Sequence, residues 1–258
     1  MKTLAAAAVL AGAAALPAAA ETAVALTGDR TLLWIDTATA TVTGSAEVQG
    51  VDRLLGIDLR PSDGKVYGVT ADQTLVTIDP MTGETAEVSK FDIPLELTEG
   101  SVVVDFNPAA DKLRFMSGTV NHRIDPATGA VTVDKPLAFV EGDMHAGEAP
   151  MIVAAAYTNS HGKPEKTAMY DIDATIVGLI QQTAPNDGTL AAVGKLGIDA
   201  AETYAFDIAT TADGTNTAWL VAGQNLHTVD LATGAVSGTW ALSGAEGAIR
   251  DITVLPAM

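Results

Sequence analysis

The stretch "TIDPMTGETAEV", residues 77–88, decides the fold because the chain repeats it. A close copy, "RIDPATGAVTV", occupies residues 123–133, and another, "TVDLATGAVSG", occupies residues 228–238. In each copy a β-rich run leads into an Asp-x-x-Thr-Gly turn, and a second β-rich run follows. The Asp side chain can accept backbone N–H groups in such a turn, and Gly adopts the left-handed conformation without strain. Each copy therefore predicts a β-hairpin.

Alignment on the shared aspartate brings out two weaker copies, "LLWIDTATATV" and "MYDIDATIVGL". The five aspartates are Asp36, Asp79, Asp125, Asp173 and Asp230, separated by 43, 46, 48 and 57 residues. A second strand–turn–strand element precedes the hairpins, most clearly in "GIDLRPSDGKVYGV" (56–69) and "VVDFNPAADKLRFM" (103–116). Two hairpins per unit make four strands, and the repeat length is typical of propeller blades.

The two ends of the repeat array complement each other. The segment "AVALTG" from Ala23 supplies strands for the first unit but no copy of the strand that begins the other units. The segment "IRDITV" from Ile249 supplies that strand, with no further hairpin after it. We therefore predict an all-β fold, a single β-propeller of five four-stranded blades closed by the C-terminal strand. Four blades, or six with one degenerate blade, are the alternatives, because the unit from Asp173 to Asp230 is long.

The first twenty residues are typical of a secretory signal peptide. Lys2 precedes an alanine-rich apolar run from Leu4 to Leu16, and Ala18 to Ala20 offer small residues for cleavage. The chain has no cysteine, which excludes disulfides and a lipid-anchored cysteine. We expect a signal peptide at 1–20, a propeller domain at 21–258, and a soluble protein in the periplasm or outside the cell.

The charge balance is strongly acidic. The 258 residues include 14 basic and 32 acidic side chains, and removal of Lys2 with the signal peptide leaves a formal charge of −19. Nucleic acids and anionic lipid surfaces are bound through Lys and Arg, so this balance argues against both as partners. No apolar segment after the signal peptide is long enough to span a membrane. The expected partner is an unknown small molecule or protein, and the acidity is compatible with cation binding or with a solvated surface alone.

Several strings in the sequence resemble a known family. "AAAYTNS" at 154–160, "APNDGTLAAVGKLGID" at 184–199, "GIDLRPSDGKVYGV" and the "DPATGA" turn are similar to those of exported bacterial proteins that are defined only as a domain of unknown function. The resemblance extends over nearly the whole chain after the signal peptide. It implies a secreted, propeller-like β protein and implies no established activity or site.

The strand that begins each unit provides the candidate site, because the innermost strands of a propeller line its channel. One position of this strand holds Asp58, Asp105, Tyr157, Asp207 and Asp251 in the five units. Two residues later, on the same side of the strand, come Arg60, Asn107, Asn159, Ala209 and Thr253. Calcium prefers several hard oxygen ligands, so a divalent cation such as calcium is a possible cofactor. The candidate metal ligands are Asp58, Asp105, Asn107, Asn159, Asp207 and Asp251.

Other interpretations of these aspartates remain open. Each Asp can accept backbone N–H groups within or between blades, and repetition in four units favours this structural role. Arg60 can neutralise the carboxylates without a metal. A catalytic arrangement is the third alternative, by analogy with lactonase-like propellers that hold a divalent ion in the channel.

Two classes of function follow. The sequence lacks a nucleophile elbow, a zinc-protease helix and a phosphate-binding glycine loop, which favours a binding or scaffold module that is not an enzyme. The alternative is a metal-dependent hydrolase of lactones or phosphoesters, with its site at the channel mouth. Loops at about 136–151 and 183–203 interrupt the repeat, and we expect any partner to be bound there.

Overall fold

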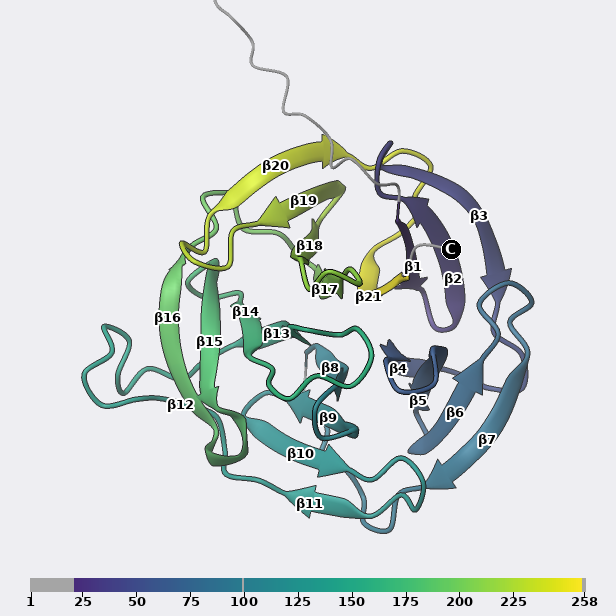
Figure 1. Ribbon diagram of the computed structural model, residues 1–258, viewed down its shortest axis with the longest axis horizontal. Helices are drawn as coiled ribbons and strands as arrows, with labels where there is room; N and C mark the ends of the chain where they lie inside the picture. Colours follow the sequence, from purple (N-terminus) through teal and green to yellow (C-terminus); the bar gives the residue numbers. More distant parts are fainter. Residues whose placement is uncertain (1–20, 99, 257–258) are drawn as a thin grey trace, which may run out of the picture.

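Five antiparallel β-sheets surround a central axis like the blades of a propeller (Figure 1). The computed structural model describes residues 21–98 and 100–256, so the predicted signal peptide at 1–20 lies outside the described residues. The prediction of an all-β propeller with five four-stranded blades is confirmed. Within the described part of the chain, no helix is long and apolar enough to cross a membrane.

Each blade has its strands in the same order from the axis outward. Blade 1 consists of β21 (Ile249–Leu255), β1 (Thr22–Thr27), β2 (Thr31–Asp36) and β3 (Thr41–Glu47). Blade 2 consists of β4 (Leu54–Arg60), β5 (Lys65–Thr70), β6 (Thr74–Ile78) and β7 (Thr85–Lys90). Blade 3 consists of β8 (Val102–Asn107), β9 (Lys112–Ser117), β10 (Val120–Ile124) and β11 (Val131–Val133). Blade 5 consists of β17 (Tyr204–Thr210), β18 (Asn216–Ala222), β19 (Asn225–Val229) and β20 (Val236–Ala241).

Blade 4 departs from this plan. It consists of β13 (Ile152–Tyr157), β14 (Met169–Asp173), β15 (Gly178–Ala184) and β16 (Thr189–Lys195), with a short additional strand at its outer edge, β12 (Ala138–Phe139). A single turn of 3-10 helix, η1 (Pro185–Asp187), joins β15 to β16. The additional strand and the helical turn belong to the two segments that interrupt the repeat in the sequence.

The C-terminal strand closes the ring, as the sequence predicts. β21 pairs antiparallel with β1 from Thr22 opposite Leu255 to Thr27 opposite Ile249, and it is the innermost strand of blade 1. The inner strands contact each other in the cyclic order β21, β4, β8, β13, β17. The first and last strands of the propeller are therefore neighbours in one sheet, blade 1.

The hydrophobic core is divided among the five junctions between neighbouring blades. At the junction of blades 1 and 2, for example, Leu26 and Leu32 pack with Ile57 and Val66. At the junction of blades 5 and 1, Trp219 packs in the same cluster as Ile252. Because each blade buries both of its faces against neighbours, removal of apolar side chains from water stabilises the ring as a whole rather than one blade at a time.

The aspartate of the repeated hairpin has the role expected from the sequence. In all five copies its Oδ1 atom accepts the backbone N–H groups two and three residues later; in the hairpin of residues 77–88, Asp79 accepts those of Met81 at 2.8 Å and Thr82 at 3.1 Å. The aspartate side chain thereby stabilises the turn that it begins.

The glycine of the same turn joins one blade to the preceding one. Gly83 has a φ of +74°, and a Cβ placed on it would lie 2.0 Å from the carbonyl oxygen of Glu47 in β3 of blade 1. The carbonyl of Gly83 also accepts the backbone N–H of Gln49 at 2.8 Å. Gly129 approaches Lys90 of blade 2 in the same way, with a corresponding distance of 1.9 Å. The glycine of the repeat is therefore required by a contact between blades as well as by the turn itself.

We expect Gly83→Ala to cost about 3 kcal/mol or more in the free energy of unfolding, because it adds a clash with backbone to a left-handed conformation. Gly64→Ala is the matched control, since Gly64 has a φ of +69° and no atom within 4 Å of an added Cβ. Its expected cost is about 1 kcal/mol, from the backbone conformation alone. Urea unfolding of both variants measures the difference, and equal costs would show that the turn does not hold the blades together.

Candidate functional site in the central channel

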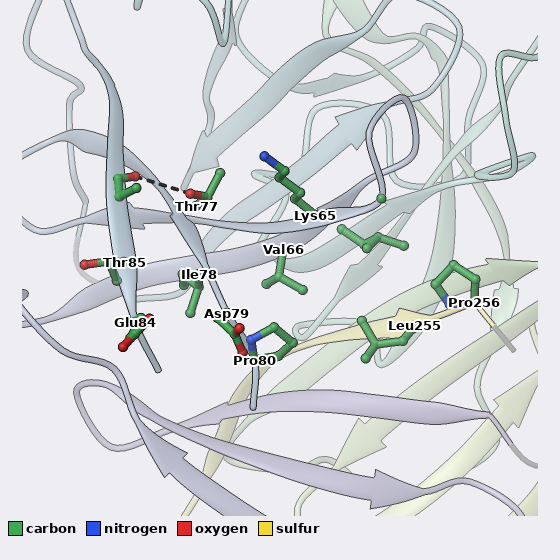
Figure 2. Close-up of a pocket in the computed structure, with 13 residues that line it drawn as sticks. Lys65, Val66, Thr77, Ile78, Asp79, Pro80, Glu84, Thr85, Leu255 and Pro256 are labelled. Carbon is green, nitrogen blue, oxygen red and sulfur yellow. Dashed lines mark hydrogen bonds between the residues drawn. The ribbon is translucent and has the colours of Figure 1, made fainter. Parts of the chain in front are cut away.

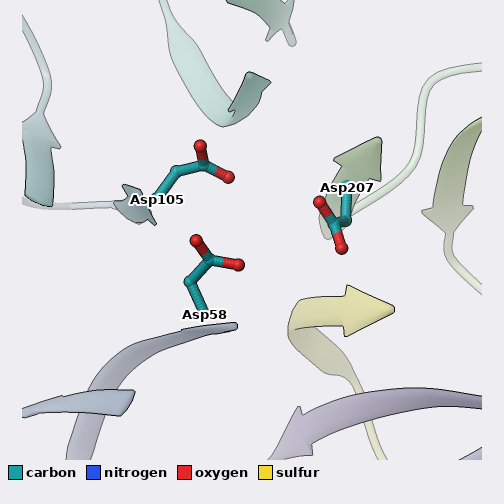
Figure 3. A group of neighbouring side chains, drawn as sticks. All are labelled: Asp58, Asp105 and Asp207. Atoms are coloured by element: carbon teal, nitrogen blue, oxygen red, sulfur yellow. The ribbon is translucent and has the colours of Figure 1, made fainter. Parts of the chain in front are cut away.

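Three of the predicted aspartates meet where the inner strands surround the axis. One carboxylate oxygen from each of Asp58, Asp105 and Asp207 lies within 4.8 Å of the other two. Figure 3 shows the three side chains facing a common space from β4, β8 and β17. All three are buried, with exposed fractions of 5 to 7%. The sequence alignment therefore identifies three side chains that the fold brings together from three different blades.

Each of these carboxylates also links its blade to the next one. Asp58 Oδ2 accepts the backbone N–H of Phe106 in blade 3 at 2.6 Å. Asp105 Oδ1 accepts that of Tyr157 in blade 4 at 3.1 Å, and Asp207 Oδ2 accepts that of Val254 in blade 1 at 2.6 Å. The inner strands have no sheet partner on this side, so the carboxylates satisfy backbone donors that burial would otherwise leave without acceptors. The structural role expected from the repetition is thus present.

Blade 1 makes the same link through Thr253. Its Oγ1 atom accepts the backbone N–H of Leu59 in blade 2 at 2.9 Å and donates to Asp58 Oδ1 at 2.9 Å. Asp251 lies two residues earlier, where its Oδ2 accepts the backbone N–H of Ile57 at 2.8 Å. Asp251 therefore links blades 1 and 2 as well, but it is not part of the group formed by Asp58, Asp105 and Asp207.

The other predicted ligands lie in different surroundings. Asn107 Oδ1 accepts two backbone N–H groups of the turn that follows β8, at 3.0 and 2.9 Å. Asn159 Oδ1 accepts a hydrogen bond from the side-chain amide of Asn216 in blade 5 at 3.0 Å. Arg60 binds Asp111 at 2.6 Å and Asp63 at 3.2 Å, so its charge is compensated outside the channel.

A small cavity separates the three aspartates. Its volume is about 10 Å³, and its walls include Asp58, Asp105, Tyr157, Asp207 and Thr253. A space of this size holds about one water molecule or one monatomic ion. The cavity is polar, and three carboxylates border it.

Burial makes the charged form of these carboxylates costly. It raises the pKa of Asp58 and of Asp105 well above the usual value, and the negative charges of the neighbouring aspartates raise both further. Burial likewise raises the pKa of Asp207 to about 6, against the hydrogen bonds donated by Val254 and Ile208. The group must therefore bind protons or a cation to offset its own charge.

A buried arginine next to the channel was not predicted from the sequence. Arg114 in β9 is 1% exposed and donates to Asp134 at 2.7 Å and to Asn121 at 2.8 Å. It also reaches blade 4, where it donates to Tyr157 Oη at 3.2 Å and to Asn186 Oδ1 at 2.9 Å. Its place in an alternating β-strand, two positions after a lysine, gives no indication of burial.

Asp171 is a second unpredicted group, in β14 of blade 4. Its side chain is 0% exposed, and both of its oxygens lack a hydrogen-bond donor, as does Oε1 of the adjacent Gln182. Burial raises the pKa of Asp171 well above the usual value. A protonated Asp171 can donate to Gln182 Oε1, which gives two of these three oxygens a hydrogen bond.

Several further concavities among the described residues have the size of ligand sites, with volumes of about 370 to 860 Å³. One of them is a groove of about 680 Å³ between blades 1 and 2. Figure 2 shows its lining side chains, with Leu255 and Pro256 on one side and Ile78 on the other. A second pocket, of about 370 Å³, lies where blade 3 meets blade 4 and has Tyr157 in its wall. Tyr157 thus borders both this pocket and the channel cavity.

Residues 31–253 match the model of a family described as "Domain of unknown function (DUF4394)". The chain belongs to this family. The resemblance noted in the sequence is thereby confirmed. Among curated proteins, none matches the DUF4394 chain significantly.

Several solved structures are similar to this DUF4394 protein to different degrees. A protein of unknown function from Bacteroides thetaiotaomicron VPI-5482 has 15% identity and a TM-score of 0.50, covering 94% of this chain and 68% of the other. One of unknown function from Bacteroides caccae has 8% identity and a TM-score of 0.44, covering 86% and 73%. An auxiliary nutrient binding protein from Bacteroides ovatus ATCC 8483 has 12% identity and a TM-score of 0.47, covering 76% and 55%. At 15% identity, the likeness to the first of these structures concerns the fold alone.

We expect Asp171→Asn to raise the stability of the protein at neutral pH by about 2 kcal/mol, because it replaces a buried ionisable group by a neutral one that can still donate to Gln182. The raised pKa gives the sign. The stability associated with a protonated Asp171 is fully present below about pH 3.8, the value for an exposed Asp, and is lost as pH rises through the folded-state pKa. Variant and parent should therefore be equally stable near pH 3.5 and diverge above it. Urea unfolding across this range tests the expectation, and a variant less stable at every pH would contradict it.

Proposed function

We propose that the protein is an exported binding module without catalytic activity, and that its central channel holds one divalent cation such as calcium. The observation that carries this proposal is the cavity of about 10 Å³ bordered by three buried carboxylates. The cation would join blades 2, 3 and 5 through Asp58, Asp105 and Asp207.

The arrangement of oxygens supports a cation of this size. Calcium binds oxygen ligands at 2.3–2.6 Å, so ligands on opposite sides of one ion are about 5 Å apart. The separation of up to 4.8 Å between the three carboxylate oxygens lies within this limit. Asp105 Oδ2 accepts no hydrogen bond from any described residue, and Thr253 adds a hydroxyl oxygen to the cavity wall. A cation there would replace the protons that the buried carboxylates otherwise require.

The same dimensions argue against the alternative, a metal-dependent hydrolase at the channel mouth. A catalytic metal needs an open coordination position for water or substrate, with space beside the ion for the reacting group. A cavity of about 10 Å³ is filled by the ion itself. In addition, both oxygens of Asp58 and of Asp207 already accept backbone N–H groups. These aspartates are therefore better placed to hold the ring together than to open for a substrate.

Calcium is expected to stabilise the protein after treatment with a chelator. A ligand that binds only the folded state, at a hundred times its dissociation constant, adds about 2.7 kcal/mol to the free energy of unfolding. The added stability should decrease as the pH falls below about 6, because protons then compete with the cation for Asp207. Thermal unfolding with and without calcium, at pH 7.5 and pH 5, measures both effects.

Asp105→Asn should reduce the calcium effect while keeping an oxygen for the N–H of Tyr157. The matched control is Asp171→Asn, because Asp171 is also buried but lies outside the channel group. The proposal of a cation is wrong if calcium, magnesium, manganese and zinc all leave the unfolding temperature unchanged, or if both variants lose the effect equally.

Export is the part of the proposal that concerns residues 1–20. The N-terminal sequence has the features of a cleaved signal, and β1 of the propeller begins at Thr22, just after the expected cleavage point. We expect the protein from its bacterial host to begin at Glu21 and to occur in the periplasm or the medium. N-terminal sequencing after cell fractionation tests this, with a variant that lacks residues 2–20 as the control that should stay in the cytoplasm. A cell-associated protein that retains Met1 would contradict export.

A further inference from the structure

The pocket between blades 3 and 4, named here the Tyr157 pocket, lies where the repeat is broken. It has a volume of about 370 Å³, within the range of sites for small ligands, and its walls include Asn107, Tyr157, Met169, Gln181 and Asn186. Blade 4 is the blade in which the inner-strand aspartate is replaced, by Tyr157. It also carries the helical turn η1, which provides Asn186. The pocket is therefore formed by features that the other four blades do not share.

The floor of the pocket is a row of side chains across three strands. Tyr157 in β13 pairs with Met169 in β14, and Met169 pairs with Gln182 in β15. Directly opposed residues in antiparallel strands project to the same face, so the three side chains lie side by side. All three are at least nine-tenths buried. Met169 has no exposed surface, so a ligand in the pocket would contact the less buried parts of the wall, such as Ala184 and Pro185.

Two polar groups of the pocket wall are hydrogen-bond donors held in place by one arginine. Arg114 donates to Tyr157 Oη and to Asn186 Oδ1, which leaves the hydroxyl proton of the first and the amide protons of the second without an acceptor among the described residues. Asn107 uses its side-chain oxygen for two backbone N–H groups, and its amide is directed at the Tyr157 hydroxyl group. The arginine thus orients its two acceptors so that their own protons can be given to a ligand.

Charged groups of both signs surround the pocket, and Asp105 lies near Tyr157 while Asp171 lies near Arg114. Arg114 and Arg123 both bind Asp134, at 2.7 Å each, so two positive charges share one carboxylate. Asp187 at the rim is paired with Lys135 at 2.7 Å. Donors that an arginine orients toward one space are complementary to an anionic oxygen, and hydrogen bonds to a charged group are about twice as strong as those to a neutral one.

We propose that the Tyr157 pocket binds the carboxylate group of a small organic acid. The carboxylate would accept hydrogen bonds from Tyr157 Oη and the side-chain amide of Asn186, and the organic part would lie against Ala184 and Pro185. This inference rests on the proposed binding function and gives it a ligand class. It does not depend on the channel cation, because calcium-dependent stabilisation is measured separately.

Tyr67 in blade 2 provides a matched control for Tyr157. Its hydroxyl group also contacts an arginine, Arg60, at 3.2 Å, but it donates its proton to Asp63 at 2.7 Å. Tyr67 is not part of the pocket wall. Removal of either hydroxyl group breaks a contact with an arginine, but only Tyr157→Phe removes a proton available to a ligand.

The test is calorimetric titration of the calcium-saturated protein at pH 7.5 with benzoate, hexanoate and succinate, each compared with its neutral amide. We expect at least one acid to bind at least tenfold more tightly than its amide. Tyr157→Phe should weaken that binding at least tenfold, and Tyr67→Phe should change it less than twofold. If Tyr157→Phe does not fold by circular dichroism, Asn186→Ala is expected to weaken binding in the same direction.

Three outcomes would overturn the proposal. They are the absence of binding by all three acids in the millimolar range, amides that bind as tightly as their acids, and binding that survives both Tyr157→Phe and Asn186→Ala. In each of these cases the calcium-dependent unfolding temperature still reports on the channel cation, so failure of the carboxylate site and failure of the proposed channel cation are distinguishable.

Discussion

The hydrogen bond from a backbone N–H group of one blade to an aspartate of the preceding blade is the interaction on which the ring depends. Sheets of neighbouring blades share no strand pairing, so the inner edge of each blade presents buried donors with no backbone partner. Asp58, Asp105 and Asp207 accept these donors across three of the five junctions, and Thr253 and Asp251 do so at a fourth. The fifth junction, between blades 4 and 5, uses Ser160, whose hydroxyl group donates to the Ile208 carbonyl at 2.7 Å.

The use of aspartates as acceptors at the blade junctions brings negative charge to the centre of the molecule. A threonine or serine would satisfy one donor without charge, as Thr253 does in blade 1, but a carboxylate accepts several and so can hold its own strand and the next one. The consequence is electrostatic, because three carboxylates within 4.8 Å repel each other in a buried site. The architecture and a requirement for protons or a cation thus arise from the same side chains.

The sequence predicts the repeated parts of the structure well. The Asp-x-x-Thr-Gly turn carries its own hydrogen bonds and its own left-handed residue, so it defines a hairpin wherever it occurs, and the spacing of its copies gives the number of blades. Closure by β21 was predictable because one missing strand and one surplus strand occur at opposite ends. The alignment of the first strand of each unit places Asp58, Asp105 and Asp207 at one position, and the fold brings these three side chains together.

The parts that the sequence did not predict depend on contacts between units. The alignment places Asp251 with the other aspartates, but the link to blade 2 at the corresponding point is made by Thr253, because register across a junction is not encoded in either strand alone. The burial of Arg114 depends on Asn186 and Tyr157 of another blade, and the burial of Asp171 depends on a neighbouring blade covering it. Long-range packing of this kind leaves no local pattern.

Closure by the last strand also constrains how the molecule can fold. Blade 1 cannot be completed until Ile249–Leu255 has emerged from the ribosome, since its innermost strand is the final one in the chain. The junctions of blades 1 and 2 and of blades 5 and 1 both include residues of this strand or its sheet. The pairing of residues near Thr22 with residues near Leu255 is among the most distant in sequence that the chain allows, and such contacts form slowly. Until β21 is available, blade 1 lacks its innermost strand and the ring stays open.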